Sequence, residues 1–139
     1  MRTTEEVIGH HIESMAAGDL NALLSDYSDD AVVLTPSGTF SGHDEIKAFF
    51  EGFMSSLPEA FVAAMELEVN VTSGEYGYMT CNAGEFTPLG TDTYHVVDGK
   101  FVCSLSLHTC LRDREPGYRA TFLVCFSSFY SDLQKTGYF

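Results

Sequence analysis

The sequence predicts a single α+β domain in which helices come first and cover one face of a mostly antiparallel β-sheet. Before Pro58, apolar residues recur at helical spacing behind helix-capping residues. After Pro58, β-branched and aromatic residues alternate with polar ones, and turn residues separate the runs. Helices followed by strands are typical of an α+β domain. The length of 139 residues and the hydrophobic content of 45% suit one hydrophobic core.

The first helix begins with a capping box. Thr3 and Glu6 have the spacing at which each side chain can bond the other residue's free backbone N–H. Gly18 is suited to end this helix, and Asp19 to begin a second, short one. Apolar stripes at helical spacing run along both segments: Val7, Ile8, His11, Ile12 and Met15, then Leu20, Leu23 and Leu24.

A short strand and a third helix follow. Residues 31–35 are β-branched and apolar, and the turn residues 36–38 end the run. Ser41 is suited to begin the third helix, and Pro58 ends it. The broad apolar face of this helix carries Ile46, Phe49, Phe50, Phe53 and Leu57.

The strands of the sheet come after Pro58. Ser73-Gly74 and Asp98-Gly99 indicate hairpin turns between neighbouring runs. The predicted strands span residues 61–71, 76–86, 91–97, 101–108 and 118–126.

The charge of the chain excludes several classes of partner. Twenty acidic and seven basic residues give a net charge of −13. Nucleic acids and anionic membrane surfaces attract basic proteins, so we expect neither as a partner. No apolar run is long enough to span a bilayer, and the opening "MRTTEEVIGHH" lacks the apolar stretch of an export signal. We therefore expect a cytoplasmic protein.

The cysteines do not indicate a metal site. Cys81, Cys103, Cys110 and Cys125 form no CxxC pair, and His108 beside Cys110 is a lone cluster. We expect reduced thiols that pack as small hydrophobic side chains, with no metal and no cofactor.

Two stretches resemble a known family. "MAAGDLNALLSDYSDDAVVLTPSGTFSGHDEIKAFF" and "GTDTYHVVDGKFV" are similar to SnoaL-like polyketide cyclases and ketosteroid-isomerase-like proteins of the nuclear transport factor 2-like superfamily. The resemblance runs from about Thr3 to about His108. It implies a cystatin-like α+β barrel, in which a strongly curved, cone-shaped sheet wraps around the N-terminal helices and leaves a deep pocket. It also implies a homodimer packed through the sheet.

The resemblance implies two candidate catalytic residues. The oxyanion-stabilising tyrosine of ketosteroid isomerases falls on His11, and their protonated aspartate falls near Asp92. Their proton-shuttling aspartate falls on Thr35, whose hydroxyl cannot act as a base near neutral pH. SnoaL-like cyclases rely instead on one sheet aspartate helped by a histidine, which Asp92 and His11 could supply.

The alternation of residues supports an inward Asp92. In an extended strand Asp92 shares a face with Tyr94 and Val96, so it points with the core and could donate or accept a proton. The alternative is a strand-end carboxylate that caps a loop. His11 lies within the apolar arc of the first helix and either lines the pocket or bonds a backbone carbonyl, whereas its neighbour His10 is expected in solvent.

The remaining candidate side chains are given expected positions but no catalytic role. Tyr27 is expected to end the second helix, in the pocket or in the core; Glu85 is a pocket acid or a rim charge. His95 and His108 are expected to face solvent or a dimer contact. The predicted pocket-lining residues are Tyr27, Thr35, Phe50, Phe53, Glu85 and Tyr94.

These features lead to one functional hypothesis and one alternative. The hypothesis is a SnoaL-like protein that binds a small apolar ligand and acts on an apolar carbonyl compound by acid/base chemistry, as an isomerisation, cyclisation or dehydration. The alternative is a non-catalytic ligand-binding or assembly module. Residues 1–110 are expected to form the SnoaL-like domain, and residues 111–139 an extension that adds a strand to it.

Overall fold

The computed structural model describes residues 1–109 as four helices and one six-stranded sheet. The helices are α1 (Thr4–Ala17), α2 (Leu20–Leu24), α3 (Gly42–Ser56) and α4 (Glu59–Ala64). The strands are β1 (Tyr27–Thr35), β2 (Gly38–Ser41), β3 (Glu66–Ser73), β4 (Tyr76–Ala83), β5 (Thr87–Val97) and β6 (Lys100–Thr109). The predicted strand 118–126 and the extension 111–139 lie outside the described residues.

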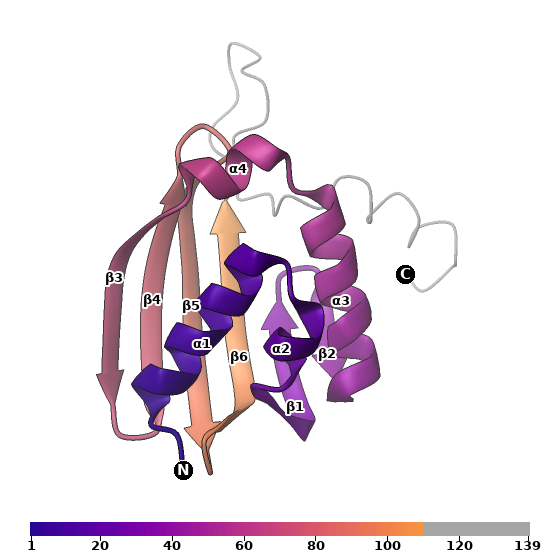
Figure 1. Cartoon of the computed structure of the whole chain (residues 1–139), viewed down its shortest axis with the longest axis vertical. Coiled ribbons are helices and arrows are strands. Elements are labelled where there is room, and N and C mark those ends of the chain that lie inside the picture. Colours follow the sequence, from indigo (N-terminus) through magenta and orange to yellow (C-terminus); the bar gives the residue numbers. More distant parts are fainter. Residues whose placement is uncertain (110–139) are drawn as a thin grey trace.

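The sheet is open, curved and mostly antiparallel. Its strand order is β2-β1-β6-β5-β4-β3, with β1 and β6 parallel and every other pair antiparallel. The helices lie on one side of it, with α1 crossing in front of the long strands (Figure 1). The α+β class and the sheet wrapped around N-terminal helices are thus confirmed.

The capping signals of the first two helices are confirmed. The Thr3 hydroxyl accepts a bond from the Glu6 N–H at 3.2 Å, and the Glu6 carboxylate accepts one from the Thr3 N–H at 2.7 Å. Gly18 ends α1 in the left-handed region with φ of 69°. The Asp19 side chain accepts from the Ala22 N–H at 2.9 Å at the start of α2.

One predicted strand begins too early, and one predicted helix start is confirmed without a side-chain cap. The strand predicted over 61–71 begins only at Glu66, because Pro58 starts the short helix α4 as well as following α3. Phe61 is the buried residue of that helix, and its ring centroid lies 6.2 Å from the ring centroid of Phe86. Ser41 does begin α3, but its side chain makes no capping bond; the Glu45 carboxylate accepts from the Ser41 N–H instead.

Helix α1 packs directly on the sheet at a glycine. A Cβ atom built on Gly77 of β4 would collide with the Ile8 side chain, so only glycine permits this approach. The Thr4 hydroxyl donates to the Gly74 carbonyl at 2.7 Å beside it. The core fills the space between α1, α2, α3 and the sheet, and its fully buried members include Val7, Ile8, Leu23, Ala31, Val33, Ile46 and Phe101.

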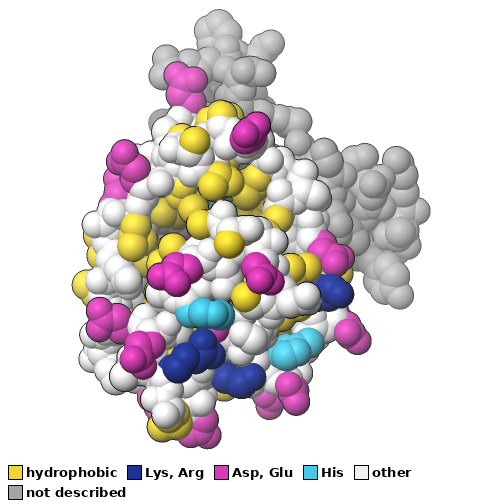
Figure 2. All heavy atoms as spheres, in the orientation of Figure 1, with side chains coloured by type: hydrophobic (Ala, Val, Ile, Leu, Met, Phe, Trp, Pro, Cys, Tyr) yellow, Lys and Arg dark blue, Asp and Glu magenta, His cyan; other side chains and the backbone are white. Residues whose placement is uncertain are grey.

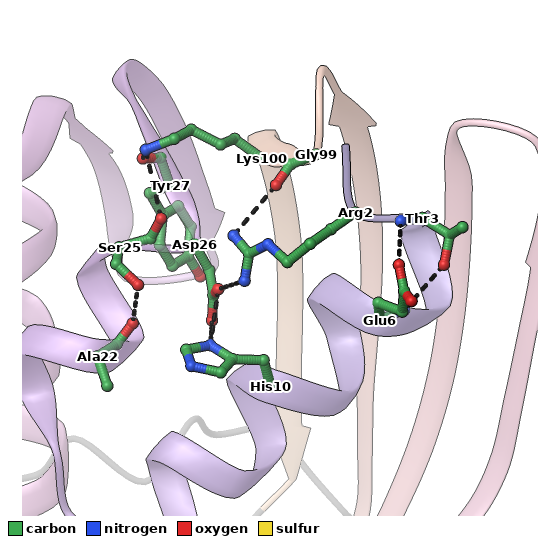
Figure 3. Close-up of polar contacts among 10 residues, drawn as sticks. All are labelled: Arg2, Thr3, Glu6, His10, Ala22, Ser25, Asp26, Tyr27, Gly99 and Lys100. Carbon is green, nitrogen blue, oxygen red and sulfur yellow. Dashed lines mark hydrogen bonds and ion pairs between the residues drawn. The ribbon is translucent and has the colours of Figure 1, made fainter.

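A buried carboxylate joins the ends of several elements (Figure 3). Asp26, between α2 and β1, is fully buried and accepts from Arg2 at 2.6 Å. The Nδ1 atom of His10 lies 2.8 Å from the same oxygen, and the Phe101 N–H donates to the Asp26 carbonyl at 2.7 Å. The expectation that His10 is simply solvated is wrong, since its ring binds Asp26. The cluster fixes α1 against the start of β6.

Candidate functional site

A large cavity of about 1180 Å³ opens between the helices and the concave face of the sheet. Most of its lining is apolar, as expected for a small-molecule site. Figure 2 shows apolar side chains gathered in a hollow between α1 and α4 on the helix side of the molecule. The apolar wall includes Ile12, Met15, Phe49, Phe50, Phe53 and Phe61.

Asp92 of β5 lines this cavity and is only 6% exposed. Asp92, Tyr94 and Val96 are all buried, while Thr93 between them is exposed. The alternation predicted from the sequence is therefore confirmed. A carboxyl group can face the same way as the core here because that face borders a cavity.

The partner of Asp92 is His108 of β6. The His108 Nε2 atom lies 3.4 Å from the Asp92 Oδ2 atom, and both side chains line the cavity. The ring edge of His108 also contacts Phe53 of α3, with 5.9 Å between centroids. The expectation that His108 faces solvent or a dimer contact is wrong.

A bulge explains why His108 points inward. The hairpin pairs Val97 with Lys100 and Val96 with Phe101, but His95 then pairs with Cys103. One extra residue in β6 reverses which of its side chains face the helices from that point on. Asp92 consequently pairs with Ser106, and His108 arrives on the concave face beside it. A regular hairpin would have pointed His108 the other way.

His11 of α1 is buried in an aromatic cage and also lines the cavity. Its ring meets those of Tyr27, Phe50, Tyr94 and Phe101 edge-on, with centroids 5.3 to 5.9 Å apart. Burial lowers the pKa of His11 to about 4, against an opposing effect of Asp92. The ring is thus neutral near pH 7, and its Nδ1 atom has no hydrogen-bond partner within the described residues. His11 shares the cavity with Asp92, but His108 makes the direct contact.

Two buried tyrosines complete the polar part of the cavity. Tyr94 donates its hydroxyl to the Met79 sulfur at 3.5 Å, a weak acceptor. Burial, and then Asp92, raise the pKa of Tyr94 well above its usual value, and burial does the same for Tyr27. Both hydroxyls therefore stay protonated. Tyr27 starts β1 instead of ending α2, and it belongs both to the core and to the cavity lining.

The other predicted pocket residues all border the cavity, in different settings. Phe50 is buried and Phe53 half-buried on α3. The Thr35 hydroxyl lies 2.8 Å from that of Ser37 and donates to the Gly38 carbonyl at 3.2 Å, so it serves the β1–β2 turn. Glu85 lies exposed in the turn after β4, at the rim.

Cys81 of β4 is a cavity residue that the sequence did not single out. It is buried, and its sulfur, a carboxylate oxygen of Asp92 and a ring nitrogen of His108 all lie within 4.8 Å of one another. Burial, with a contribution from Asp92, raises the pKa of the Cys81 thiol to about 11. Cys103, by comparison, is half-buried outside this group. Only the three-strand register brings these side chains together.

The part of the chain that the structure describes contains no helix long and apolar enough to cross a bilayer. Comparison with curated proteins found no match in sequence. A family model, that of the SnoaL-like domain, matches residues 8–104, which is well over half of the chain.

Solved structures with the same fold have low sequence identity. An NTF2-like protein of unknown function from Burkholderia xenovorans is 21% identical, with a TM-score of 0.62 over 87% of this chain and 93% of that one. A SnoaL-like protein of unknown function from Burkholderia thailandensis is 18% identical, with a TM-score of 0.64 over 76% and 94%. A protein proposed to be a polyketide cyclase from Sinorhizobium meliloti is 16% identical, with a TM-score of 0.60 over 72% and 92%. These likenesses show the fold that the sequence resemblance implied.

Proposed function

The chain belongs to the SnoaL-like domain family, and on that premise we propose that it binds a small, largely apolar carbonyl compound and transfers a proton on it. The observation that carries the proposal is the contact of Asp92 with His108 at 3.4 Å, in a cavity whose other walls are mostly apolar. An apolar wall selects the carbon skeleton of the ligand, and a small number of polar groups is then enough to orient the ligand's one polar end.

Asp92 is the proposed base. Its carboxylate takes a proton from the carbon next to the carbonyl, and the electron pair left behind forms an enolate. Return of the proton to a different carbon completes an isomerisation. When the enolate attacks a second carbonyl carbon, the new alkoxide takes the proton from Asp92 and a cyclisation is complete. When the enolate instead expels a β-hydroxyl group, that group leaves as water with the proton from Asp92, and a dehydration is complete. Thr35, at the place where isomerases carry their base, cannot take this role, and Asp92 is the buried carboxylate among the cavity residues, whereas Glu59 and Glu85 are exposed.

The oxygen of the enolate needs a hydrogen-bond donor. The neutral His11 ring and the protonated Tyr94 hydroxyl both line the cavity near Asp92, and neither requires a change of charge to donate. His108 is proposed to hold Asp92 in place, with Phe53 packed against its ring. The catalytic pair in this proposal remains Asp92 and His11, and His108 is a positioning residue.

A test needs a generic probe, because the substrate is not identified. β-Tetralone is a bicyclic apolar ketone whose exchange of α-hydrogen for deuterium can be followed by NMR in D2O. With a chelator present, the protein should accelerate this exchange, and Asp92→Asn should abolish the acceleration. Asp98→Asn is the matched control, since Asp98 is an exposed turn residue with φ of 51°, which asparagine tolerates. An unchanged rate in Asp92→Asn would refute Asp92 as the base.

The alternative function is binding without chemistry, and the threonine at position 35 favours it. In that case β-naphthol, a fluorescent apolar alcohol, binds in the cavity while no exchange of β-tetralone is detected. The cavity walls are then the functional feature, and Asp92 only bonds the ligand's hydroxyl. Loss of β-naphthol binding on Phe50→Ala, with no exchange in any variant, would identify this function.

A homodimer through the sheet is also proposed. Val71, Tyr78 and Leu105 lie in one cross-strand row on the face away from the helices, and they are 55%, 40% and 52% exposed. Apolar surface of this kind is typical of a protein contact. Light scattering should show a dimer that Leu105→Glu converts to a monomer; an unchanged mass would exclude this interface. The cytoplasmic location stays a prediction.

A further inference from the structure

We propose that Cys81, Asp92 and His108 form a zinc-binding site at the sheet wall of the cavity. Each residue comes from a different neighbouring strand: β4, β5 and β6. One ligand atom of each lies within 4.8 Å of the other two, and the Asp92 and His108 atoms are 3.4 Å apart. Cys81 and Asp92 are buried and the His108 side chain is 22% exposed, and all three residues line the cavity on its sheet side.

The strand register builds this cluster. Cys81 pairs with Gly90, and Gly90 pairs with His108, so the three form one row across the sheet. Asp92 lies two residues further along β5 and therefore projects from the same face. The bulge in the β5–β6 hairpin is what turns His108 toward this face. The three donors thus converge because of the sheet, independently of any flexible loop.

Gly90 leaves the space in which the donors meet. A Cβ atom at this position would lie 2.6 Å from the Cys81 sulfur and 3.3 Å from the His108 Cδ2 atom. The side chains of Cys81 and His108 lean toward each other over the bare backbone. A side chain at position 90 would push them apart, so the glycine acts as the floor of the site.

The donor set favours zinc over harder ions. Sulfur, imidazole nitrogen and carboxylate oxygen are the ligands that zinc takes in proteins, whereas calcium and magnesium require oxygen ligands. Zinc bonds of about 2.0 to 2.3 Å place neighbouring ligand atoms roughly 3.3 to 3.8 Å apart in a tetrahedron. The Asp92–His108 distance already matches this, and the Cys81 sulfur has to approach by at most about 1 Å, which a small side-chain rotation can supply.

The fourth position of such a site faces the cavity. Three protein ligands with one open position are typical of zinc sites that bind water or a ligand oxygen. A carbonyl compound in the cavity could therefore place its oxygen on the ion. A zinc ion bound to the Asp92 carboxylate would prevent that carboxylate from acting as a base. The metal-bound protein and the proton-transferring protein are therefore alternative states of the same site. The inference rests on the cluster and the glycine floor, and it does not depend on the proposed proton transfer.

The site can be tested on the full chain with metal alone. Cys110 and Cys125 are first replaced by serine, so that Cys81 and Cys103 are the remaining thiols. After treatment with a chelator and its removal, the protein is titrated with cobalt(II), whose thiolate charge-transfer absorption reports a cobalt–sulfur bond. We expect one ion per chain, with displacement by zinc. Cys81→Ser should remove the absorption, and Cys103→Ser, the matched control, should retain it.

The remaining ligands give a second readout. His108→Gln should weaken zinc binding by about tenfold or more in calorimetry, and zinc should raise the melting temperature of the parent protein but not of Cys81→Ser. If Cys81→Ser fails to fold, Asp92→Asn takes its place in the same titrations. Absence of the charge-transfer absorption, or its persistence without Cys81, would overturn the proposal. If the protein binds the metal but does not exchange β-tetralone in chelator, the zinc site is supported and only the proposed proton transfer is refuted. If it exchanges β-tetralone but does not bind the metal, the proton transfer is supported and the zinc site is refuted.

Discussion

Asp92 and His108 face each other across two adjacent strands, 3.4 Å apart, at the wall of the apolar cavity. The bulge that follows the Asp98-Gly99 turn produces this contact by reversing the facing of β6. The cavity therefore contains a hydrogen-bonded polar pair where alternation in an unbulged hairpin would have placed a single acid.

The first prediction concerns His108 as a positioning residue. His108→Phe keeps a ring beside Phe53 but removes the nitrogen that contacts Asp92. The rate of β-tetralone exchange in chelator should fall about tenfold, the size expected for one lost hydrogen bond to a charged group. Binding of β-naphthol should change much less. His95→Phe is the control, because His95 stacks on Tyr76, whose side chain is exposed; equal effects of both variants would contradict this role.

The second prediction concerns the space over Gly90. Gly90→Ala should lower the free energy of unfolding by about 1 to 3 kcal/mol, because the new methyl group meets the Cys81 sulfur. In Cys81→Ala the sulfur is absent, so the same Gly90→Ala change should cost less there. Chemical denaturation of the four proteins measures the coupling. Strictly additive effects would show that Cys81 does not lean over Gly90.

The third prediction is a pH dependence caused by His11. The unfolded chain protonates this residue near pH 6.5, but the folded protein does so only near pH 4. Between these values the unfolded state binds more protons, so stability falls as the pH falls, by up to ~3 kcal/mol in total. His11→Gln, which cannot titrate, should lose less stability over this window. Urea unfolding from pH 7.5 to 4.5 checks this; parallel curves for the two proteins would exclude a buried neutral His11.

The fourth prediction concerns Asp26. Asp26→Ala removes the acceptor that Arg2 and His10 share, and it should lower the free energy of unfolding by about 2 to 4 kcal/mol. Asp29→Ala is the matched control, because that side chain is fully exposed and should change stability by less than about 0.5 kcal/mol. Similar losses for both variants would show that the buried cluster contributes nothing specific.

Local signals predicted the first three helices and the inward Asp92. Thr3, Gly18 and Asp19 act within a turn of their own position, so the sequence contains everything that their capping needs. The alternation around Asp92 also follows from the residues of one strand. The prediction for the short apolar run at Phe61 was wrong because the run is too short to show a period. A run of that length is compatible with a strand and with a helix alike.

The contacts of His10, His108 and Cys81 were not predicted because each depends on residues that are distant in the sequence. His10 is held by Asp26 from beyond α2, a partner that helical spacing does not reveal. His108 and Cys81 enter the site through a bulge and a three-strand register, neither of which is visible in the order of residues. The roles of Asp92 and His11 in chemistry remain predictions, because position in a cavity does not establish a reaction.

The most direct measurement is a crystal structure of the protein with β-naphthol bound. It tests whether the cavity takes up an apolar molecule and turns that molecule's polar end toward the Asp92 wall. We expect the ring system among Phe49, Phe50 and Phe53, with the hydroxyl within hydrogen-bond distance of Asp92 or His11. A cavity without the probe, or a probe whose hydroxyl points to the mouth beside Glu85, would contradict it.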